Sequence, residues 1–338
     1  MTQAFKIIFP AAYAVEFEPQ GTIPVPGDDE FVLETRYSLI SPGTELALYM
    51  GTHIGLNDPG NSWAKYPFSP GYAAVGRIIP QGGRVPQTNP ELLYFASTPH
   101  QTYSRAATNS GQFLLAVPEG LAPEHAIFCR LAAIAATAIA VAPVLPGERV
   151  AVLGAGLIGN LAAQRYQVAG AHVAVVETNE ARQHIARQCG LTAVAGGNNV
   201  SERLKTALEG EPDVVIEATG VAALVNGALD MVRRRGRVVL LGSPRGMTEI
   251  NAYRHIHARG VTMTGAHEGL QGTDGLPSRR ELTENSLALI ARDELKVAPL
   301  LTQVLPASSI QEAYEMLIHQ QDKALGIVLD WQSIKERY

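Results

Sequence analysis

The stretch Val150-Ala-Val-Leu-Gly-Ala-Gly-Leu-Ile-Gly159 decides the fold of this chain. It joins a short apolar strand to three glycines in the spacing Gly154-x-Gly156-x-x-Gly159, and a helical pattern follows. Glycines at these positions let the backbone turn tightly and approach a pyrophosphate, which then lies at the N-terminus of the helix. The glycine spacing alone has low specificity. Strand, turn and helix in this order, however, predict a dinucleotide-binding βαβ unit.

A carboxylate follows this turn where a dinucleotide site needs one. The next predicted strand, 172–177, ends in Glu177. A carboxylate there accepts hydrogen bonds from the adenosine ribose hydroxyls and repels a 2′-phosphate, which favours NAD over NADP. Arg182 follows closely and could pair with such a phosphate, so NADP stays open as the less favoured cofactor.

Other strand ends complete the predicted cofactor site. Strands and helices alternate from about residue 123 to residue 265, which is typical of a parallel sheet covered by helices. Ligands of such sheets bind at the carboxyl ends of the strands. The residues that we expect near the cofactor are Gly154, Gly156, Leu157, Ile158, Gly159, Glu177, Arg182, Thr219, Gly220, Gly242, Ser243, Ala266 and His267. Any single strand end could also be an ordinary turn.

The residues up to about 120 have a different pattern. They are rich in proline and glycine and contain short β-like runs such as 31–37 and 73–79, which are typical of a small all-β domain. Residues 51–66 form a predicted long loop, and such loops in compact domains are often functional. The C-terminal part contains two helical segments, 280–291 and 309–320, followed by an apolar strand.

Composition and charge exclude several classes of function. The chain has 338 residues, a net charge of −5 and a pI of about 6.0, which argues against nucleic-acid or anionic-membrane binding. We find no signal peptide, and the longest apolar stretch, 126–145, is interrupted by Arg130 and Pro143. The only two cysteines, Cys129 and Cys189, cannot form a disulfide framework. These features predict a cytoplasmic protein with a small-molecule substrate.

The order of these motifs resembles the medium-chain dehydrogenase/reductase superfamily. The resemblance covers nearly the whole chain. It rests on the β-rich first region, on the glycine turn 154–159, on the strands within 213–220 and 236–242, and on the ending 299–328.

This resemblance implies an α/β protein of two domains. A GroES-like catalytic domain would comprise residues 1–121 and 270–338, and a Rossmann domain with a doubly wound parallel sheet would comprise residues 122–269. The resemblance also implies hydride transfer between a nicotinamide cofactor and an alcohol or carbonyl compound. Family members usually form homodimers or homotetramers, and Val261–Gly265 has the β-propensity to pair across a two-fold axis.

The chain departs from the zinc-binding members of this superfamily at their metal ligands. Their Cys-Gly-(Ser/Thr)-Asp segment reads Pro42-Gly-Thr-Glu45 here, and their Gly-His-Glu segment reads Gly71-Tyr-Ala73. Proline and alanine cannot bind a metal, and tyrosine is a poor zinc ligand. We therefore expect no catalytic zinc. A relocated site made of Glu45, His53, His100 and Cys129 remains an alternative.

The segments Ser41–Leu46 and Tyr66–Tyr72 are similar to a zinc-lacking branch that includes bacteriochlorophyllide dehydrogenases and relatives thought to act on sugars or polyols. Without zinc, a side chain must take the proton of the alcohol. The candidates for this catalytic role are Thr44, Tyr72, Glu45, His53 and His100. In the predicted loop, Trp63 could stack on a sugar ring and Lys65 could meet an anion, although Trp63 could equally anchor the loop.

Three functions remain open on the sequence. The leading hypothesis is an NAD-dependent dehydrogenase of a polyol, sugar or sugar derivative that works without zinc. The second is an NADPH-dependent reductase of quinones or enones, against which Glu177 argues. The third is a protein that binds the cofactor without turnover.

Overall fold

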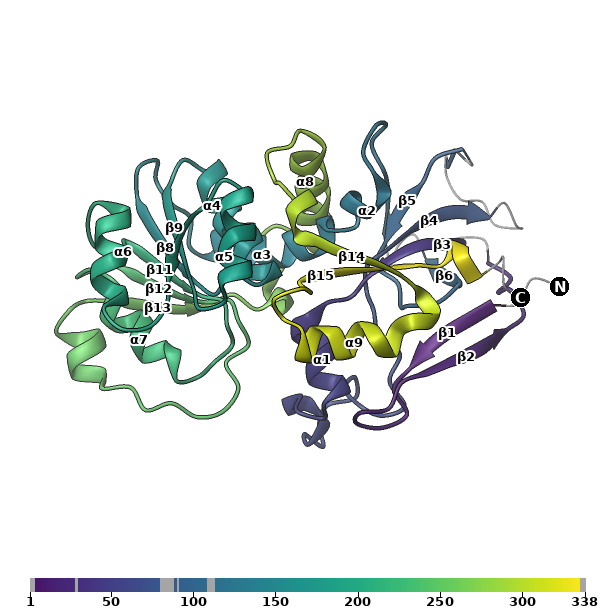
Figure 1. The fold of residues 1–338 in the computed structure, drawn as a ribbon, viewed down its shortest axis with the longest axis horizontal. Helices are drawn as coiled ribbons and strands as arrows, with labels where there is room; N and C mark the ends of the chain where they lie inside the picture. The colour runs from purple at the N-terminus through teal and green to yellow at the C-terminus, as the bar shows by residue number, and fades with distance from the viewer. Residues whose placement is uncertain (1–3, 28–29, 80–87, 90, 108–112, 335–338) are drawn as a thin grey trace. The chain divides into compact units, whose positions relative to one another are not determined.

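The computed structural model describes residues 4–27, 30–79, 88–89, 91–107 and 113–334, which form two compact units. A discontinuous unit comprises Met1–Arg130 and Leu301–Tyr338, and a continuous unit comprises Leu131–Leu300. Figure 1 shows both units and the labels used below.

These limits differ from the expected domain ranges, because residues 270–300 cluster with the continuous unit. Leu282 of helix α8 (Arg279–Ala291) packs on Ala133 and Ala136 of α3 (Cys129–Val141). The Gln271 amide donates hydrogen bonds to the Ala133 carbonyl and to Thr137 Oγ1. The first limit also moves from residue 121 to Arg130, just inside α3.

The continuous unit is a Rossmann fold. Its six strands are parallel and lie in the order β10-β9-β8-β11-β12-β13. The chain runs through β8 (Arg149–Leu153), α4 (Leu157–Val168), β9 (His172–Glu177), α5 (Glu180–Gln188), β10 (Thr192–Ala195), α6 (Val200–Leu208), β11 (Val214–Glu217), α7 (Leu224–Met231), β12 (Arg237–Leu240), a π-helical turn (Ala252–His257) and β13 (Thr262–Gly265). This is the strand order of dinucleotide-binding sheets, in which the order reverses beside the first strand.

Alternating apolar residues explain why this sheet is covered on both faces. Ala151, Leu153 and Val215 face one buried cluster together with residues of α6 and α7, such as Leu204 and Leu229. Figure 1 shows α4 and α5 on the other face. The carboxyl ends of β8, β9, β11 and β12 therefore open at a single edge of the sheet, as the sequence predicted.

The discontinuous unit is built around an antiparallel sheet with one parallel pair at its edge. Its order is β14-β15-β3-β4-β5-β7, with β6 also paired to β3, while β1 and β2 form a separate hairpin. The elements are β1 (Ala4–Ile8), β2 (Glu16–Gly21), β3 (Glu30–Leu39), α1 (Pro42–Tyr49), β4 (Ala74–Ile79), β5 (Tyr94–Ala96), β6 (Tyr103–Ala107), β7 (Leu114–Ala116), α2 (Pro123–Ala126), β14 (Leu301–Pro306), α9 (Ile310–His319) and β15 (Gly326–Asp330).

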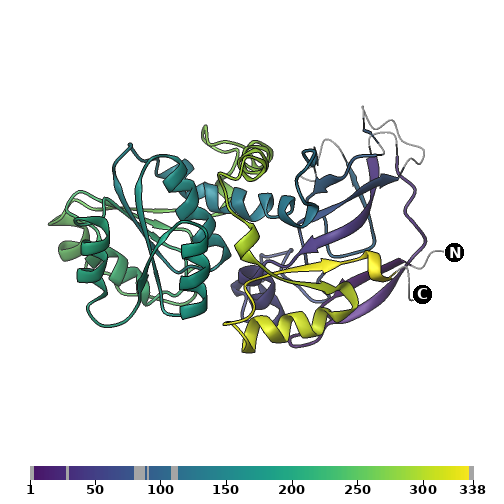
Figure 2. The same ribbon diagram turned by 45° about the horizontal axis from the view of Figure 1, so that its top comes forward.

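The core of this unit joins the two ends of the chain. Phe9 and Tyr49 from the N-terminal part pack with Tyr314 and Trp331 from the C-terminal part in one buried cluster. Figure 2 shows α9 beside β14 and β15, the segment that completes the sheet. This packing fixes α1, which begins at Pro42, close to the residues of the candidate site.

The expected all-β character of the first region was incomplete, because α1 is helical. Pro42 occupies the first position of the helix, where its fixed φ suits a helix and its missing N–H is not needed. Among the described residues, one helical stretch, Pro123–Val141, is long and apolar enough to cross a membrane. Two thirds of it (67%) is buried, as in a core helix of a soluble protein.

Candidate active site

The glycine turn after β8 has the geometry of a nucleotide-binding loop. Gly154 has φ +94°, and a Cβ there would lie 2.8 Å from Thr219 Cγ2. At Gly159 a Cβ would lie 2.0 Å from the Gly154 carbonyl oxygen. A Cβ on Gly156, the N-cap of α4, would instead meet nothing within 4 Å. The fold thus requires the first and third glycines, and the second leaves open space at a helix N-terminus, which fits a pyrophosphate.

Glu177 lies at the end of β9 and is 7% exposed. Its carboxylate accepts hydrogen bonds from the backbone N–H groups of Ala155 (2.9 Å), Thr178 (2.8 Å) and Asn179 (2.9 Å). The side chain therefore ties the glycine turn to the next strand end. Of the four acceptor sites of a carboxylate, one on Oε2 stays available for a ribose hydroxyl.

Glu217 ends β11 and accepts backbone hydrogen bonds there, as Glu177 does at the end of β9. It was not among the site residues predicted from the sequence. Its fully buried carboxylate accepts hydrogen bonds from the N–H groups of Thr219 (2.7 Å) and Gly220 (3.2 Å) and from the Thr219 hydroxyl. The backbone N–H of Gly242 donates to the Glu217 carbonyl oxygen (2.7 Å). Glu217 therefore holds both the loop after β11 and the loop after β12, which are two of the predicted cofactor segments. An acidic residue ending an otherwise apolar strand was the available signal.

The remaining predicted cofactor residues lie at the same end of the sheet. Ser243 follows Gly242 after β12, and Ala266 and His267 follow β13. The His267 ring accepts a hydrogen bond from Gly269 N–H, so it caps a short turn. Leu157 and Ile158 form the first turn of α4, and Arg182 lies in the first turn of α5.

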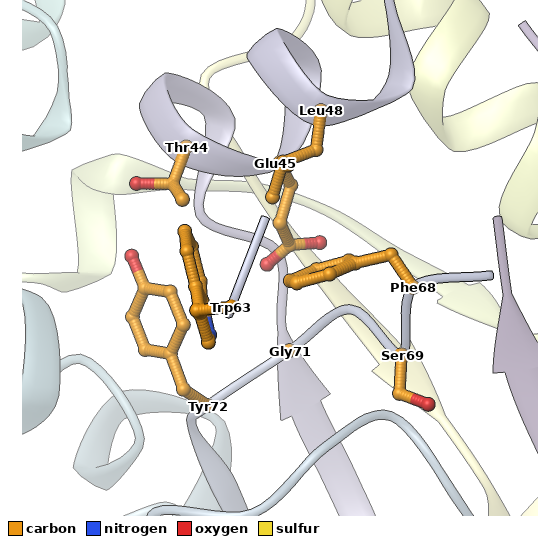
Figure 3. A pocket seen from close by; sticks show the side chains of 8 residues that line it. All are labelled: Thr44, Glu45, Leu48, Trp63, Phe68, Ser69, Gly71 and Tyr72. Atoms are coloured by element: carbon orange, nitrogen blue, oxygen red, sulfur yellow. The ribbon is translucent and has the colours of Figure 1, made fainter. Parts of the chain in front are cut away.

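A small cavity in the discontinuous unit contains the residues predicted at the chemical step. Its volume is about 80 Å³. Figure 3 shows its lining side chains, which are Thr44, Glu45, Leu48, Trp63, Phe68, Ser69, Gly71 and Tyr72. Thr44 and Glu45 come from α1, and Tyr72 comes from the segment before β4. The structure thus brings Tyr72 together with Thr44 and Glu45, as expected for residues predicted to act in one site.

Glu45 is the centre of a buried hydrogen-bond network. It is 1% exposed, and Oε1 accepts a hydrogen bond from Ser41 N–H (2.8 Å). Oε2 lies 2.7 Å from the Tyr314 hydroxyl and 3.0 Å from His100 Nε2. Burial, together with the nearby Glu45 charge, raises the pKa of Tyr314 well above its ordinary value, so its phenol keeps its proton and donates.

The direction of hydrogen bonding at His100 follows from its neighbours. Trp331 Nε1–H can only donate, and it donates to Ser38 Oγ (2.8 Å). His100 Nδ1 lies 2.8 Å from the same Ser38 Oγ, and His100 Nε2 faces the acceptor oxygen of Glu45. We infer that His100 carries its hydrogen on Nε2 and donates it to Glu45. His100 is fully buried, so it supports Glu45 and does not line the cavity.

Tyr72 presents a phenol to the cavity. Its hydroxyl donates a hydrogen bond to Ser41 Oγ, and the guanidinium of the buried Arg130 lies over its ring, 5.4 Å from the centroid. Figure 3 shows the hydroxyls of Thr44 and Tyr72 pointing toward the same part of the cavity. The site thus offers two hydroxyls and one carboxylate to a ligand.

The loop residues separate into different environments. The Trp63 ring is 52% exposed, lines the cavity and packs edge-on against Phe68 (centroids 5.2 Å apart). His53 Nδ1 accepts from Gly55 N–H (3.1 Å), and its ring contacts Trp63, so His53 shapes the loop. Lys65 lines a second cavity together with Tyr66 and Asn57. Trp63 and Lys65 therefore do not meet one ligand in the same cavity.

The residues at the family's metal positions do not fit zinc. Pro42 begins α1 and has no donor atom, and the Tyr72 phenol is hydrogen-bonded to Ser41. Across the described residues, no three His, Cys, Asp or Glu side chains gather as metal ligands, so the relocated site is not assembled. Of its four members, Glu45 and His100 meet, while His53 caps the loop.

Comparisons with known proteins agree with this architecture. A family model described as zinc-binding dehydrogenase matches residues 158–288. L-galactonate-5-dehydrogenase of Escherichia coli K12 is 26% identical over 339 residues, which cover 91% of this chain and 94% of that protein. By these matches the chain is similar to zinc-type dehydrogenases, through the family model in its Rossmann region and through this relative along nearly its whole length.

Solved structures of two dehydrogenases share the complete fold. L-idonate 5-dehydrogenase of Escherichia coli has a TM-score of 0.82 at 16% identity and covers 97% of this chain and 98% of its own. 2R,3R-butanediol dehydrogenase of Bacillus subtilis has a TM-score of 0.81 at 18% identity, with coverage of 97% and 99%. The predicted GroES-like and Rossmann domains are thus confirmed. Membership of the zinc-lacking branch stays a prediction.

Proposed function

We propose that this protein is an NAD-dependent dehydrogenase that oxidises a hydroxyl group of a polyol, sugar or sugar derivative, or reduces the matching carbonyl group. The observation that carries the proposal is the turn Gly154–Gly159, with open space at Gly156 and with Glu177 held against it. The names of the relatives, for L-galactonate, L-idonate and butanediol, agree with hydroxylated substrates.

The bound nicotinamide would accept or supply the hydride. Gly156 and the first turn of α4 would hold the pyrophosphate of the cofactor. Glu177 would accept a hydrogen bond from a hydroxyl of the adenosine ribose. The Glu177 carboxylate would repel the 2′-phosphate of NADP, which favours NAD over NADP.

The proposed chemistry proceeds without zinc, because the metal positions hold Pro42 and Tyr72. The substrate hydroxyl must then lose its proton to a side chain in the cavity. Tyr72 and Thr44 line the cavity through hydroxyls and are the proposed proton-handling pair. His53 and His100 are not proposed for this step, because neither lines the cavity.

The test is formation of NADH by metal-free protein. Chelator-treated protein is incubated with NAD and a panel of polyols, sugars and aldonates, and near-ultraviolet absorbance is followed. NADH formation that added zinc does not increase supports the proposal. Stoichiometric zinc that is lost together with activity contradicts the zinc-free mechanism, and NAD binding without turnover of any compound contradicts the reaction.

We also propose a cytoplasmic homodimer or homotetramer. β13 has β12 as its one neighbour among the strands that the structure describes, so an edge is available for pairing. Met263 is part of this strand and is exposed. Light scattering during size exclusion should give at least twice the mass of 36.1 kDa, and a monomer contradicts this proposal.

A further inference from the structure

The cavity around Tyr72 has one formal charge on its walls. Among the described residues that line it, Glu45 is the only carboxylate, and none is Lys, Arg or His. Lys65 lines the second cavity, and Arg130 lies over the Tyr72 ring without lining the cavity. The wall charge of this cavity is therefore negative.

Glu45 is fixed as a hydrogen-bond acceptor. Ser41 N–H, the Tyr314 hydroxyl and, by the network above, His100 Nε2–H all donate to it. Oε2 receives two of these hydrogen bonds and Oε1 receives one, so Oε1 retains one lone pair. That lone pair is an acceptor for a hydroxyl of a ligand.

His100, the closest side-chain partner of Glu45 besides Tyr314, does not line the cavity, so a ligand there meets the Glu45 carboxylate and not the imidazole ring. Tyr314 stays a neutral phenol. A carboxylate or phosphate entering the cavity would thus meet a buried like charge, which is unfavourable at close range.

We propose that this cavity selects an uncharged polyhydroxylated substrate over an aldonate or a sugar phosphate, and that Glu45 is the specificity-determining residue. This rests on the proposed dehydrogenase function and adds the charge class of the substrate. The rings of Trp63 and Phe68 give apolar contact for C–H faces. Discrimination arises from repulsion of the anion as much as from attraction of the polyol.

Calorimetric titration of NADH-saturated protein tests this directly, because an alcohol-form ligand and reduced cofactor cannot react. The ligands are two matched pairs, glucitol with gluconate and galactitol with galactonate, at equal ionic strength. In wild-type protein the neutral member of each bound pair should bind at least about tenfold more tightly. In Glu45→Gln the difference should shrink to less than about threefold through tighter aldonate binding.

Ser69→Ala is the matched control, since it alters an uncharged wall of the same cavity and should leave the ratio unchanged. Wild-type protein decides the question even if Glu45→Gln does not fold. An aldonate that binds as tightly as its polyol overturns the charge selection while leaving the dehydrogenase function intact, provided that NADH forms in the turnover assay. Binding of no member of either pair overturns the charge selection, and the turnover assay alone decides the dehydrogenase function.

Discussion

At the scale of single residues, Tyr72 is the side chain on which the proposed chemistry depends most. Its hydroxyl lines the cavity and is positioned by Ser41. We predict that Tyr72→Phe lowers kcat by about 10²–10⁴-fold, the usual contribution of a general acid or base. NAD affinity should not change, because the glycine turn belongs to the other unit. Steady-state kinetics and NAD titration measure the two effects.

Tyr66→Phe is the matched control for this prediction. The Tyr66 hydroxyl donates to the Leu48 carbonyl oxygen and lines the second cavity, so its loss removes a phenol of similar burial from a neighbouring segment. Activity of Tyr66→Phe should stay near that of the wild type. An equal loss of kcat in both variants would show that the effect comes from folding.

Buried phenols also predict how stability depends on pH. Desolvation raises the pKa values of Tyr49, Tyr66, Tyr166 and Tyr314. In the unfolded chain these groups lose their protons near pH 10, whereas in the folded protein they keep them to higher pH. Their contribution is therefore complete below about pH 10 and is lost as the pH rises through the folded pKa values.

Urea unfolding between about pH 8 and pH 11 measures this effect. The free energy of unfolding should fall above about pH 10, and the fall should be less steep in Tyr314→Phe, which has one phenol fewer. A flat or rising free energy over the same range is incompatible with the explanation.

Much of the candidate site could be named from sequence, but its connections could not. Thr44, Tyr72 and Glu45 follow from the family positions that they occupy, and the structure brings them together. Tyr314 and Trp331 were missed because they lie in the C-terminal segment, with no local pattern to associate them with Glu45. Such contacts depend on tertiary packing, which spacing along the chain does not encode.

At the scale of elements, the turn between β8 and α4 contains two kinds of glycine. Gly154 and Gly159 are required by the fold, whereas Gly156 faces the proposed ligand site. Gly156→Ala should change the free energy of unfolding by less than about 1 kcal/mol, because φ is −63° and the space is open, although alanine is a poorer N-cap than glycine. NAD affinity should fall at least about tenfold, since the added methyl group occupies the approach of the pyrophosphate.

Gly159→Ala should behave in the opposite way. Its Cβ would clash with the Gly154 carbonyl oxygen, so stability should fall by about 1–3 kcal/mol. Denaturant unfolding and NAD titration of both variants give the comparison. Equal destabilisation by the two substitutions would contradict the assignment of different parts to these glycines.

The pattern of apolar residues explains which elements could be predicted from the sequence. β8, β9, β11 and β12 are apolar runs between helices, and the expected ranges agree with the structure within about two residues. Helix α1 was missed because its eight residues contain Pro42 and Gly43 and have little amphipathic character. β14 was missed because its mixed residues form a strand only by pairing with β15.

At the scale of the whole molecule, the two units differ in how they use the chain. The continuous unit holds its sheet and its buried cluster in one segment. We predict that a fragment of residues 129–300 unfolds cooperatively in urea and binds NAD. A fragment of residues 1–130 should not fold, because it lacks β14, α9 and β15. Circular dichroism measures folding of each fragment, and NAD titration measures cofactor binding. An unfolded 129–300 fragment would contradict the prediction.

The position of β15 has a consequence for synthesis on the ribosome. β15 lies between β14 and β3, so residues 37–39 of β3 have no partner on that flank until the last part of the chain leaves the exit tunnel, whereas residues 30–34 can already pair with β6. The continuous unit emerges complete before that moment. The Rossmann domain is thus expected to fold first. The N-terminal segment is made earlier but keeps apolar surface exposed until the C-terminal strands arrive. Chaperones would bind the nascent chain during this period.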